Sequence, residues 1–239
     1  MLFTKQLEEV LLVPPKPKIL MTDGRAGGAW ATAASYTRTG QVTPGTELLI
    51  AFGMTRAAAA ARTATSITWN GASMTEILDI QDPGNRSGVS CYYLFDPIPA
   101  ASANMVLTMS GNCTGLALFY LCLTGVARKN PTVITSSSAN TSSSHTLTGT
   151  KTRPNSLAFQ VSSIASNAGA GATGNVSYGG QFEEIYDAGD TGADGNRAGV
   201  AYSRFSPVGG ISSTCTSVTN ENFGWTSGLI EVFAKGDPV

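Results

Sequence analysis

The sequence predicts an all-β protein, an antiparallel β-sandwich built from two internal repeats of about 100 residues behind an extended N-terminal arm. Three observations lead to this prediction. Only 13% of the 239 residues are charged and 27 are glycine, which suits short strands and tight turns better than charged helices. Apolar and small or polar residues alternate over short stretches. The hexapeptide GNRSGV at 84–89 returns as GNRAGV at 195–200.

The flanks of this hexapeptide repeat with it. ITWNG at 67–71 is answered by VSYGG at 176–180, and the following hydrophobic segments also match. The matched positions lie about 110 residues apart, which indicates two copies of one unit. We expect the arm at 1–29 and a sandwich at 30–239, with repeats at about 30–125 and 136–235. One sandwich is favoured because half-chains have short strands and open edges; two tandem sandwiches are the alternative.

The arm has no counterpart in the second repeat. It combines apolar residues at helical spacing with a proline-rich stretch, and proline fixes φ and removes backbone donors, so an extended conformation is expected. It is either a disordered tail or a segment that docks on a neighbouring subunit. The binding residues predicted here are Leu7, Val10, Leu11, Pro14, Pro15 and Pro17.

Strands are predicted wherever apolar or β-branched residues alternate between turn signals. Asn70-Gly71 is a strong hairpin signal because both residues tolerate positive φ. The expected strands are 31–39, 47–54, 66–69, 75–80, 89–95, 105–109 and 116–123, then 143–147, 156–163, 175–178, 182–186, 200–205, 212–218 and 228–234.

Three further stretches carry structural expectations. The runs 48–52 and 116–123 are apolar throughout, so these strands are expected to be central or covered on both faces. The alanine-rich stretch 56–62 is expected to form a loop with a short helical turn. The polar, serine-rich stretch 129–140 is expected to link the two repeats.

Charge, cysteine content and the N-terminus restrict the possible functions. The net charge is -1 without a basic cluster, so binding to nucleic acid is not expected. Cys91, Cys113, Cys122 and Cys215 lack metal-ligand spacing and are expected to be free, mostly buried thiols. Neither a signal peptide nor a membrane span is predicted, so a soluble, unprocessed protein without a cofactor is expected.

Several polar groups could carry chemistry. Arg86 and Arg197 occupy equivalent loop positions after acidic residues, where structural ion pairing or carbonyl capping is expected. The acidic stretch 187–196 could bind calcium, although its spacing is not that of an EF-hand. The only histidine, His145, is expected at the surface, because no nucleophile motif accompanies it.

Paired carboxylates and exposed aromatic side chains would indicate other functions. Glu76 could converge with Glu184 or Asp187 for glycoside hydrolysis; repeat equivalence instead suggests that Glu76 and Glu184 each serve their own hairpin. Trp69 and Tyr178 are either an aromatic sugar platform or core residues beside a tight turn.

Three motifs carry a resemblance to known proteins: ITWNGASMT at 67–75, CYYLFDP at 91–97 and MVLTMSG at 105–111. They resemble those of jelly-roll β-sandwich domains from bacterial surface proteins and from virions of tailed bacteriophages. The resemblance covers about residues 30–235 and supports the fold better than the role.

Among such proteins, the chain looks most like a capsid decoration (cement) protein. This implies a homotrimer, made in the host cytoplasm, that sits on the virion surface where major capsid subunits meet, without catalytic residues. The second hypothesis is a carbohydrate- or receptor-binding tail or fibre module using Trp69, Tyr178 or Trp225. The third, a jelly-roll hydrolase, is disfavoured because no nucleophile, base and orienting group can be assembled.

Overall fold

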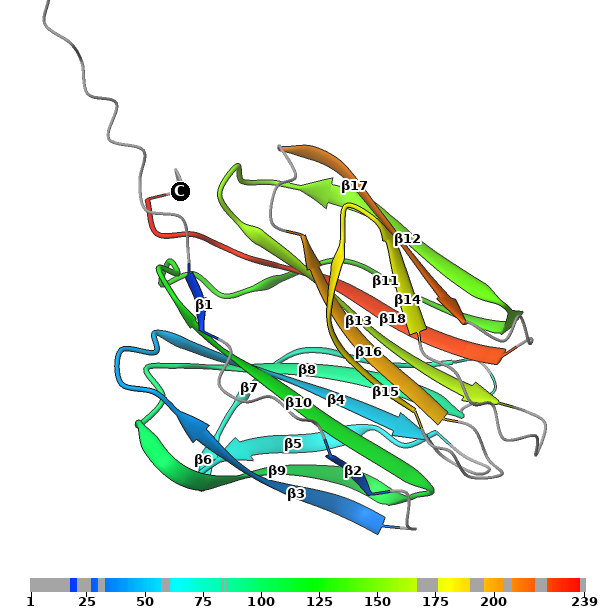
Figure 1. Ribbon diagram of the computed structural model, residues 1–239. Helices are drawn as coiled ribbons and strands as arrows, with labels where there is room; N and C mark the ends of the chain where they lie inside the picture. Colours follow the sequence, from blue (N-terminus) through cyan, green and yellow to red (C-terminus); the bar gives the residue numbers. More distant parts are fainter. Residues whose placement is uncertain are drawn as a thin grey trace, which may run out of the picture.

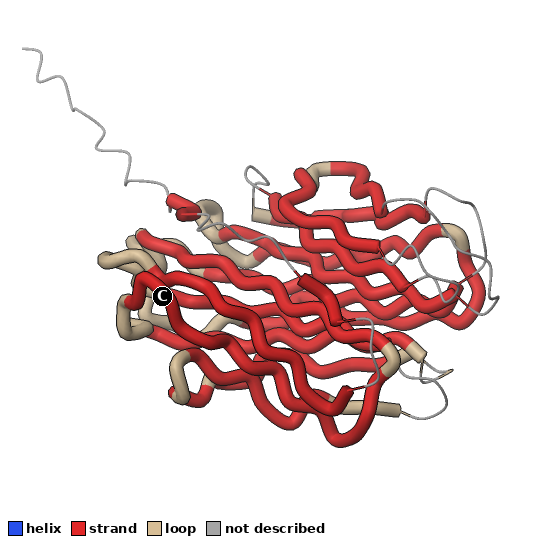
Figure 2. The backbone as a smooth tube through the Cα atoms, turned by 60° about the horizontal axis from the view of Figure 1, so that its bottom comes forward, coloured by secondary structure: helices blue, strands red, loops and turns tan. Residues whose placement is uncertain are grey.

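The computed structural model describes residues 18–20, 27–29, 33–56, 61–82, 84, 86–166, 176–189, 196–203, 208–217 and 223–236. These residues form 18 strands and no helix (Figures 1 and 2). The strands make four antiparallel sheets, so the all-β prediction is confirmed. Within the same residues, no helix is long and apolar enough to cross a membrane.

The first half of the chain forms two sheets. The N-inner sheet has the order β1-β10-β4-β8-β7, with β2 also paired to β10, and the N-outer sheet has the order β3-β9-β5-β6. The strands are β1 (Lys18–Leu20), β2 (Gly27–Ala29), β3 (Ala33–Val42), β4 (Leu48–Arg56), β5 (Ala64–Trp69), β6 (Ala72–Ser73), β7 (Thr75–Gln81), β8 (Ser87–Phe95), β9 (Ala100–Cys113) and β10 (Gly115–Thr124).

The second half forms two more sheets. The C-inner sheet has the order β11-β18-β13-β16-β15, and the C-outer sheet has the order β12-β17-β14. The strands are β11 (Thr132–Ser142), β12 (Ser144–Lys151), β13 (Leu157–Ser166), β14 (Val176–Gly180), β15 (Glu183–Gly189), β16 (Asn196–Ser203), β17 (Gly209–Ser217) and β18 (Phe223–Val232).

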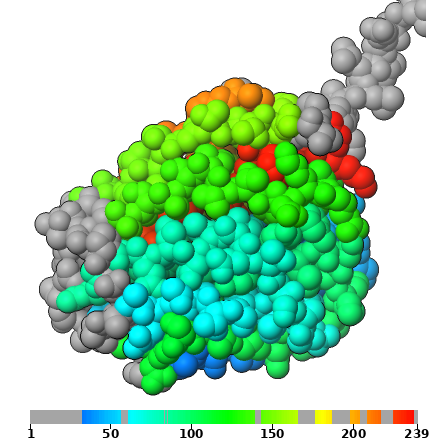
Figure 3. All heavy atoms as spheres, turned by 180° about the vertical axis from the view of Figure 1, so that it is seen from behind, coloured from blue at the N-terminus to red at the C-terminus, as the bar shows by residue number. Residues whose placement is uncertain are grey.

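The four sheets stack as four layers, N-outer, N-inner, C-inner and C-outer (Figure 1). The largest hydrophobic cluster joins the two inner sheets, with the rings of Phe52 and Phe159 6.1 Å apart. In the space-filling view the two halves meet along one boundary (Figure 3). The structure therefore differs from the single two-sheet sandwich favoured by the sequence, because each half completes its own pair of sheets.

The two apolar runs lie in the N-inner sheet, which is covered on both faces as predicted. In β4, Leu48, Ile50 and Phe52 pack toward the C-inner sheet, whereas Leu49 and Ala51 pack toward the N-outer sheet. A strand buried on both faces has no solvent side, so its hydrophobic residues need not alternate.

Strand β16 shows the same effect in the C-inner sheet. Val200 and Tyr202 face the N-inner sheet and Ala201 faces the C-outer sheet. The alternation of large and small residues along β16 therefore separates two buried faces and not a buried face from a solvent face.

Two boundaries differ from the sequence prediction. The serine-rich stretch expected to be a linker contains β11, which pairs with β18 at the edge of the C-inner sheet; an edge strand needs few apolar side chains, because backbone pairing holds it. The stretch 1–29 includes β1 and β2, which pair with β10. Residues 57–60 of the expected helical turn lie outside the described residues.

The hairpin at Asn70-Gly71 is confirmed. Asn70 has φ 48° and Gly71 has φ 81°, and the turn joins Trp69 to its cross-strand partner Ala72. Both residues have the positive φ that a tight two-residue turn requires.

Candidate interaction surfaces

The outer face of the C-outer sheet carries rows of hydroxyl groups and, over the strand residues that the structure describes, no charged side chain. Its strands alternate between buried residues such as Leu147 and Cys215 and outward residues that are small or hydroxylated. Thr146 and Thr214 pair across β12 and β17, with their hydroxyl oxygens 2.8 Å apart. This C-outer hydroxyl face consists of Ser144, Thr146, Thr148, Thr150, Ser177, Ser212, Thr214 and Thr216.

The opposite end of the stack has a similar surface. On β3, β9 and β5 the outward positions again lack Asp, Glu, Lys and Arg over the paired residues that the structure describes. Thr39 donates a hydrogen bond to Asn104 Oδ1 at 3.2 Å. This N-outer hydroxyl face consists of Ser35, Thr37, Thr39, Ser66, Thr68, Asn104, Val106 and Thr108.

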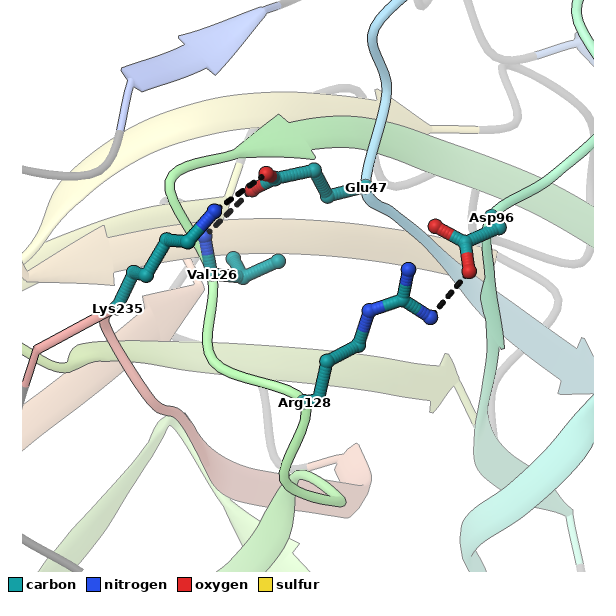
Figure 4. A network of polar contacts seen from close by, with 5 residues as sticks. All are labelled: Glu47, Asp96, Val126, Arg128 and Lys235. Carbon is teal, nitrogen blue, oxygen red and sulfur yellow. Dashed lines mark hydrogen bonds and ion pairs between the residues drawn. The ribbon is translucent and has the colours of Figure 1, made fainter.

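Charged groups gather instead where the two halves are joined (Figure 4). Glu47 accepts a hydrogen bond from the backbone N of Val126 at 3.0 Å and forms an ion pair with Lys235 at 3.4 Å. Arg128 forms an ion pair with Asp96. Both ion pairs are exposed or partly exposed and contribute little stability alone. The backbone bridge between Val126 and Ala234 joins the connection to the segment after β18, and Arg128 joins it to the residue after β8.

The residues predicted to bind a capsid or a sister subunit, Leu7 to Pro17, lie outside the described residues. The structure places the next part of the arm on the edge of the N-inner sheet, where Lys18 pairs with Thr124 and Ala29 with Leu116. The point from which residues 1–17 extend is therefore the β10 edge.

The two arginines of the repeated hexapeptide lie in different backbone positions. Arg86 precedes β8, and its backbone N donates a hydrogen bond to Asp82 Oδ1. Arg197 lies within β16 and pairs with Ile164 and Gly189. The side chains of Arg197 and of the acidic stretch expected to bind calcium are not among those that the structure describes.

The structure does not bring Glu76 and Glu184 together. Glu76 lies on β7, which contacts β11, whereas Glu184 lies on β15, the strand whose Tyr186 stacks on Phe119 of β10. Because the two inner sheets stack in opposite strand order, these carboxylates occupy opposite edges. The structure therefore gives no shared pair of carboxylates between Glu76 and Glu184.

Glu76 belongs to a polar cluster at the end of β5. The Tyr92 hydroxyl lies 3.0 Å from Glu76 Oε2 and 3.2 Å from the Ala64 carbonyl oxygen and donates its one proton between these two acceptors. Ala64 N donates to Asp79 Oδ2 at 3.0 Å. Burial, followed by hydrogen bonding to Glu76, raises the pKa of Tyr92 well above its ordinary value. Burial also raises the pKa of Asp79 to about 6.

The aromatic residues considered for a sugar platform are core residues. Trp69 and Trp225 are 1% and 0% exposed, and Tyr178 packs against the clusters between the C-inner and C-outer sheets. Trp69 donates its indole N–H to the Ile98 carbonyl at 3.2 Å. None of the three offers an open ring face, so the core alternative holds.

The prediction that His145 lies at the surface is wrong. Its side chain is 8% exposed, and it lies between the C-outer and C-inner sheets with Nδ1 3.2 Å from Ser227 Oγ. Ser227 in turn donates to Ser162 Oγ at 2.9 Å. The sequence contains a signal for this burial, because side chains alternate along a strand and His145 lies between the outward residues Ser144 and Thr146. No carboxylate of the described residues orients this pair as a catalytic triad requires.

The burial of His145 predicts a pH-dependent stability. Burial lowers the pKa of His145 below its ordinary 6.5. Above that value the side chain is neutral in both states; as the pH falls below it, the unfolded chain binds a proton that the folded chain resists. We therefore expect the free energy of unfolding to fall below pH 6.5, down to the folded-state pKa.

Urea unfolding at several pH values checks this prediction. Asp79 acts in the opposite sense, because its raised pKa lowers stability as the pH rises from 3.8 toward 6. The informative quantity is therefore the difference between the wild type and His145→Gln, which can keep a hydrogen bond to Ser227 without titrating. Parallel pH profiles for the two proteins would contradict the prediction.

The four cysteines are free and buried, as predicted. Burial raises the pKa of Cys113 to about 11 and raises the pKa of Cys91 well above its ordinary value, which suppresses the reactive thiolate. In the described part of the chain, no group of three or more His, Cys, Asp or Glu side chains could hold a metal ion.

The two hydroxyl faces were not predicted from the sequence. The sequence shows the alternation T-x-T-x-T at 146–150 and S-x-T-x-T at 212–216. Whether the hydroxyl residues or the residues between them face solvent depends on which face of the strand another sheet covers. Comparisons of this chain with protein-family models, with curated proteins and with solved structures gave no match.

Proposed function

We propose that this protein is a non-enzymatic structural subunit of a bacteriophage virion, a decoration protein that binds the outer capsid surface between major capsid subunits and stabilises the shell. The observation that carries the proposal is the pair of uncharged hydroxyl faces at the two ends of the stack. The cores of protein interfaces are depleted of charged residues, so such faces can be covered by a partner without leaving an unpaired charge.

The N-terminal segment supplies the second contact in this proposal. Residues 1–17 precede β1, which pairs with the edge of β10, and they carry the apolar residues and prolines predicted to bind. A proline-rich segment loses less conformational entropy on binding than a flexible one. Anchoring at β1 would let it reach a capsid subunit or a sister copy in a homotrimer.

We also propose the finer fold that the sequence resemblance implies, two jelly rolls stacked face to face. The support is the strand order: β1-β10-β4-β8-β7 lies against β3-β9-β5-β6, which resembles the two facing sheets of a jelly roll with β7 as an additional edge strand. In the second half, β11-β18-β13-β16-β15 lies against β12-β17-β14, with β15 as the additional edge strand. The edge strands β1 and β2 would then correspond to β11, so each repeat would begin earlier than predicted.

The pairing registers support the internal repeat. Ile50 pairs with Tyr93 and Leu121, and Phe159 pairs with Tyr202 and Ile230. The three steps along the sequence, from 50 to 159, from 93 to 202 and from 121 to 230, are equal. This register aligns Arg197 with Gly88 and does not support its equivalence with Arg86.

Binding to shells assembled from the major capsid protein of the same phage tests the proposed function. We expect full-length protein to co-sediment with shells, and deletion of residues 1–17 to abolish binding while β1 and the sheets remain. Thr146→Lys is expected to weaken binding, because it places a charge on the C-outer hydroxyl face. Light scattering is expected to give three times 24.7 kDa for the full-length protein.

The matched control is Asn130→Lys, which adds the same charge on an exposed loop and is expected to bind normally. Full occupancy by both the deletion and Thr146→Lys would refute the proposal. The alternative, a carbohydrate- or receptor-binding tail or fibre module, predicts binding on a glycan array. The burial of Trp69 and Trp225 removes the aromatic platform on which that hypothesis depended.

A further inference from the structure

The two inner sheets contact each other through residues at equivalent places in the two halves. Phe119 pairs with Phe52 on β4, and Gly228 pairs with Val161 on β13. The sequence separation between Phe52 and Val161 equals that between Phe119 and Gly228. Leu78 and Tyr186 each follow a β-bulge, with Cys91 and Val200 as their cross-strand partners. Phe119 therefore corresponds to Gly228, and Leu78 to Tyr186.

These four residues contact each other reciprocally across the layers. A Cβ placed on Gly228 would lie 2.1 Å from Leu78 Cδ2, so the leucine occupies the space that the missing side chain leaves. At the other end of the interface, Tyr186 stacks on Phe119 with ring centroids 5.0 Å apart and an interplanar angle of 6°.

Such reciprocity defines an isologous interface: residue i of one copy touches residue j of the other, and j touches i. We propose that the facing inner sheets form an isologous interface, so that the partner fitting each inner face is a second copy of the same fold unit. The chain is a covalently linked dimer of that unit. This inference rests on the repeat proposed above and not on capsid attachment.

The size of the contacting residues explains why the halves are not interchangeable. One contact pairs a leucine with a glycine and the other a tyrosine with a phenylalanine. Each pair fills its site, but an exchange of one member would leave a void or a clash. The linked dimer has therefore diverged into two complementary faces, which favours the partner within the chain over a free copy.

Two double-mutant cycles in the full-length protein test the proposal by thermal unfolding. Gly228→Ala is expected to lower the unfolding midpoint by about 3–10 °C, because the added methyl meets Leu78. Adding Leu78→Ala is expected to restore part of this loss. Phe119→Ala and Tyr186→Ala are each expected to destabilise, and the double variant to lose less than the sum of the two.

Controls separate these contacts from general effects. Gly210→Ala has no neighbour within 4 Å of the new Cβ and is expected to leave the midpoint nearly unchanged. Leu78→Ala with Tyr186→Ala, which belong to different contacts, are expected to be additive. If Gly228→Ala does not fold, recovery of folded protein by Leu78→Ala is the same supporting result. Additive behaviour of either contacting pair overturns the proposal, whatever the outcome of capsid binding.

Discussion

Replacing Glu231 by alanine is expected to lower the free energy of unfolding by about 3–5 kcal/mol. Glu231 is fully buried on β18, and its carboxylate accepts hydrogen bonds from Thr152 N at 3.0 Å, Arg153 N at 3.1 Å and the Ser156 hydroxyl. Removal would take the acceptor away from the buried Ser156 hydroxyl and from the two backbone N–H groups at the start of the loop. Urea unfolding at pH 7 measures the loss.

The loop that Glu231 holds is also bound by a buried lysine at the end of β12. Lys151, also 0% exposed, donates from Nζ to the carbonyls of Pro154 and Ser156. Loosening the loop would move these carbonyls away from the buried ammonium group, which would lose its hydrogen-bond acceptors without gaining full hydration. This loss adds to the cost. Glu183→Ala is the control, because Glu183 is exposed and accepts a hydrogen bond from Tyr202 at 2.9 Å. Equal losses in the two variants would show that burial of Glu231 contributes nothing.

Phe159→Ala is expected to cost a similar amount, about 3–5 kcal/mol, because it opens a cavity where the two inner sheets meet. The ring lies 6.1 Å from Phe52 on the other half and 6.5 Å from Tyr202 on its own sheet. Both halves contribute to this cluster. Circular dichroism and tryptophan fluorescence should therefore report a single unfolding transition with a lowered midpoint, and not a separate transition for one half.

The control for Phe159 is Ile98→Ala, since Ile98 is 68% exposed and is expected to change stability little. Two separated transitions in Phe159→Ala, one at the wild-type midpoint, would mean that the halves unfold independently. That result would contradict a shared core between the N-inner and C-inner sheets.

The strands were readable from the sequence because their signals are local. Each of the fourteen predicted strands overlaps an observed strand, and Asn70-Gly71 adopts the positive φ values that its residue types favour. The strands that were missed, including β1, β2 and β11, are edge strands. Their pairing depends on the exposed backbone of β10 and β18, and edge strands need no apolar pattern of their own.

The candidate surfaces were less predictable than the strands. The sequence indicates that Thr146 and His145 point to opposite faces, because side chains alternate along a strand. It does not indicate which face another sheet will cover. The sequence therefore predicts His145 at the surface and does not reveal the hydroxyl rows, which the layer order leaves exposed.

By itself the sequence determined the all-β class, the two long apolar strands, the free cysteines and the tight hairpin, since each follows from composition, periodicity or the φ preference of one or two residues. Only the tertiary structure decided that there are four layers and that the inner sheets are buried on both sides. Only the tertiary structure decided that Glu76 and Glu184 stand at opposite edges. The reason is that sheet stacking depends on long-range contacts such as Phe52 with Phe159, which no local pattern along the chain specifies.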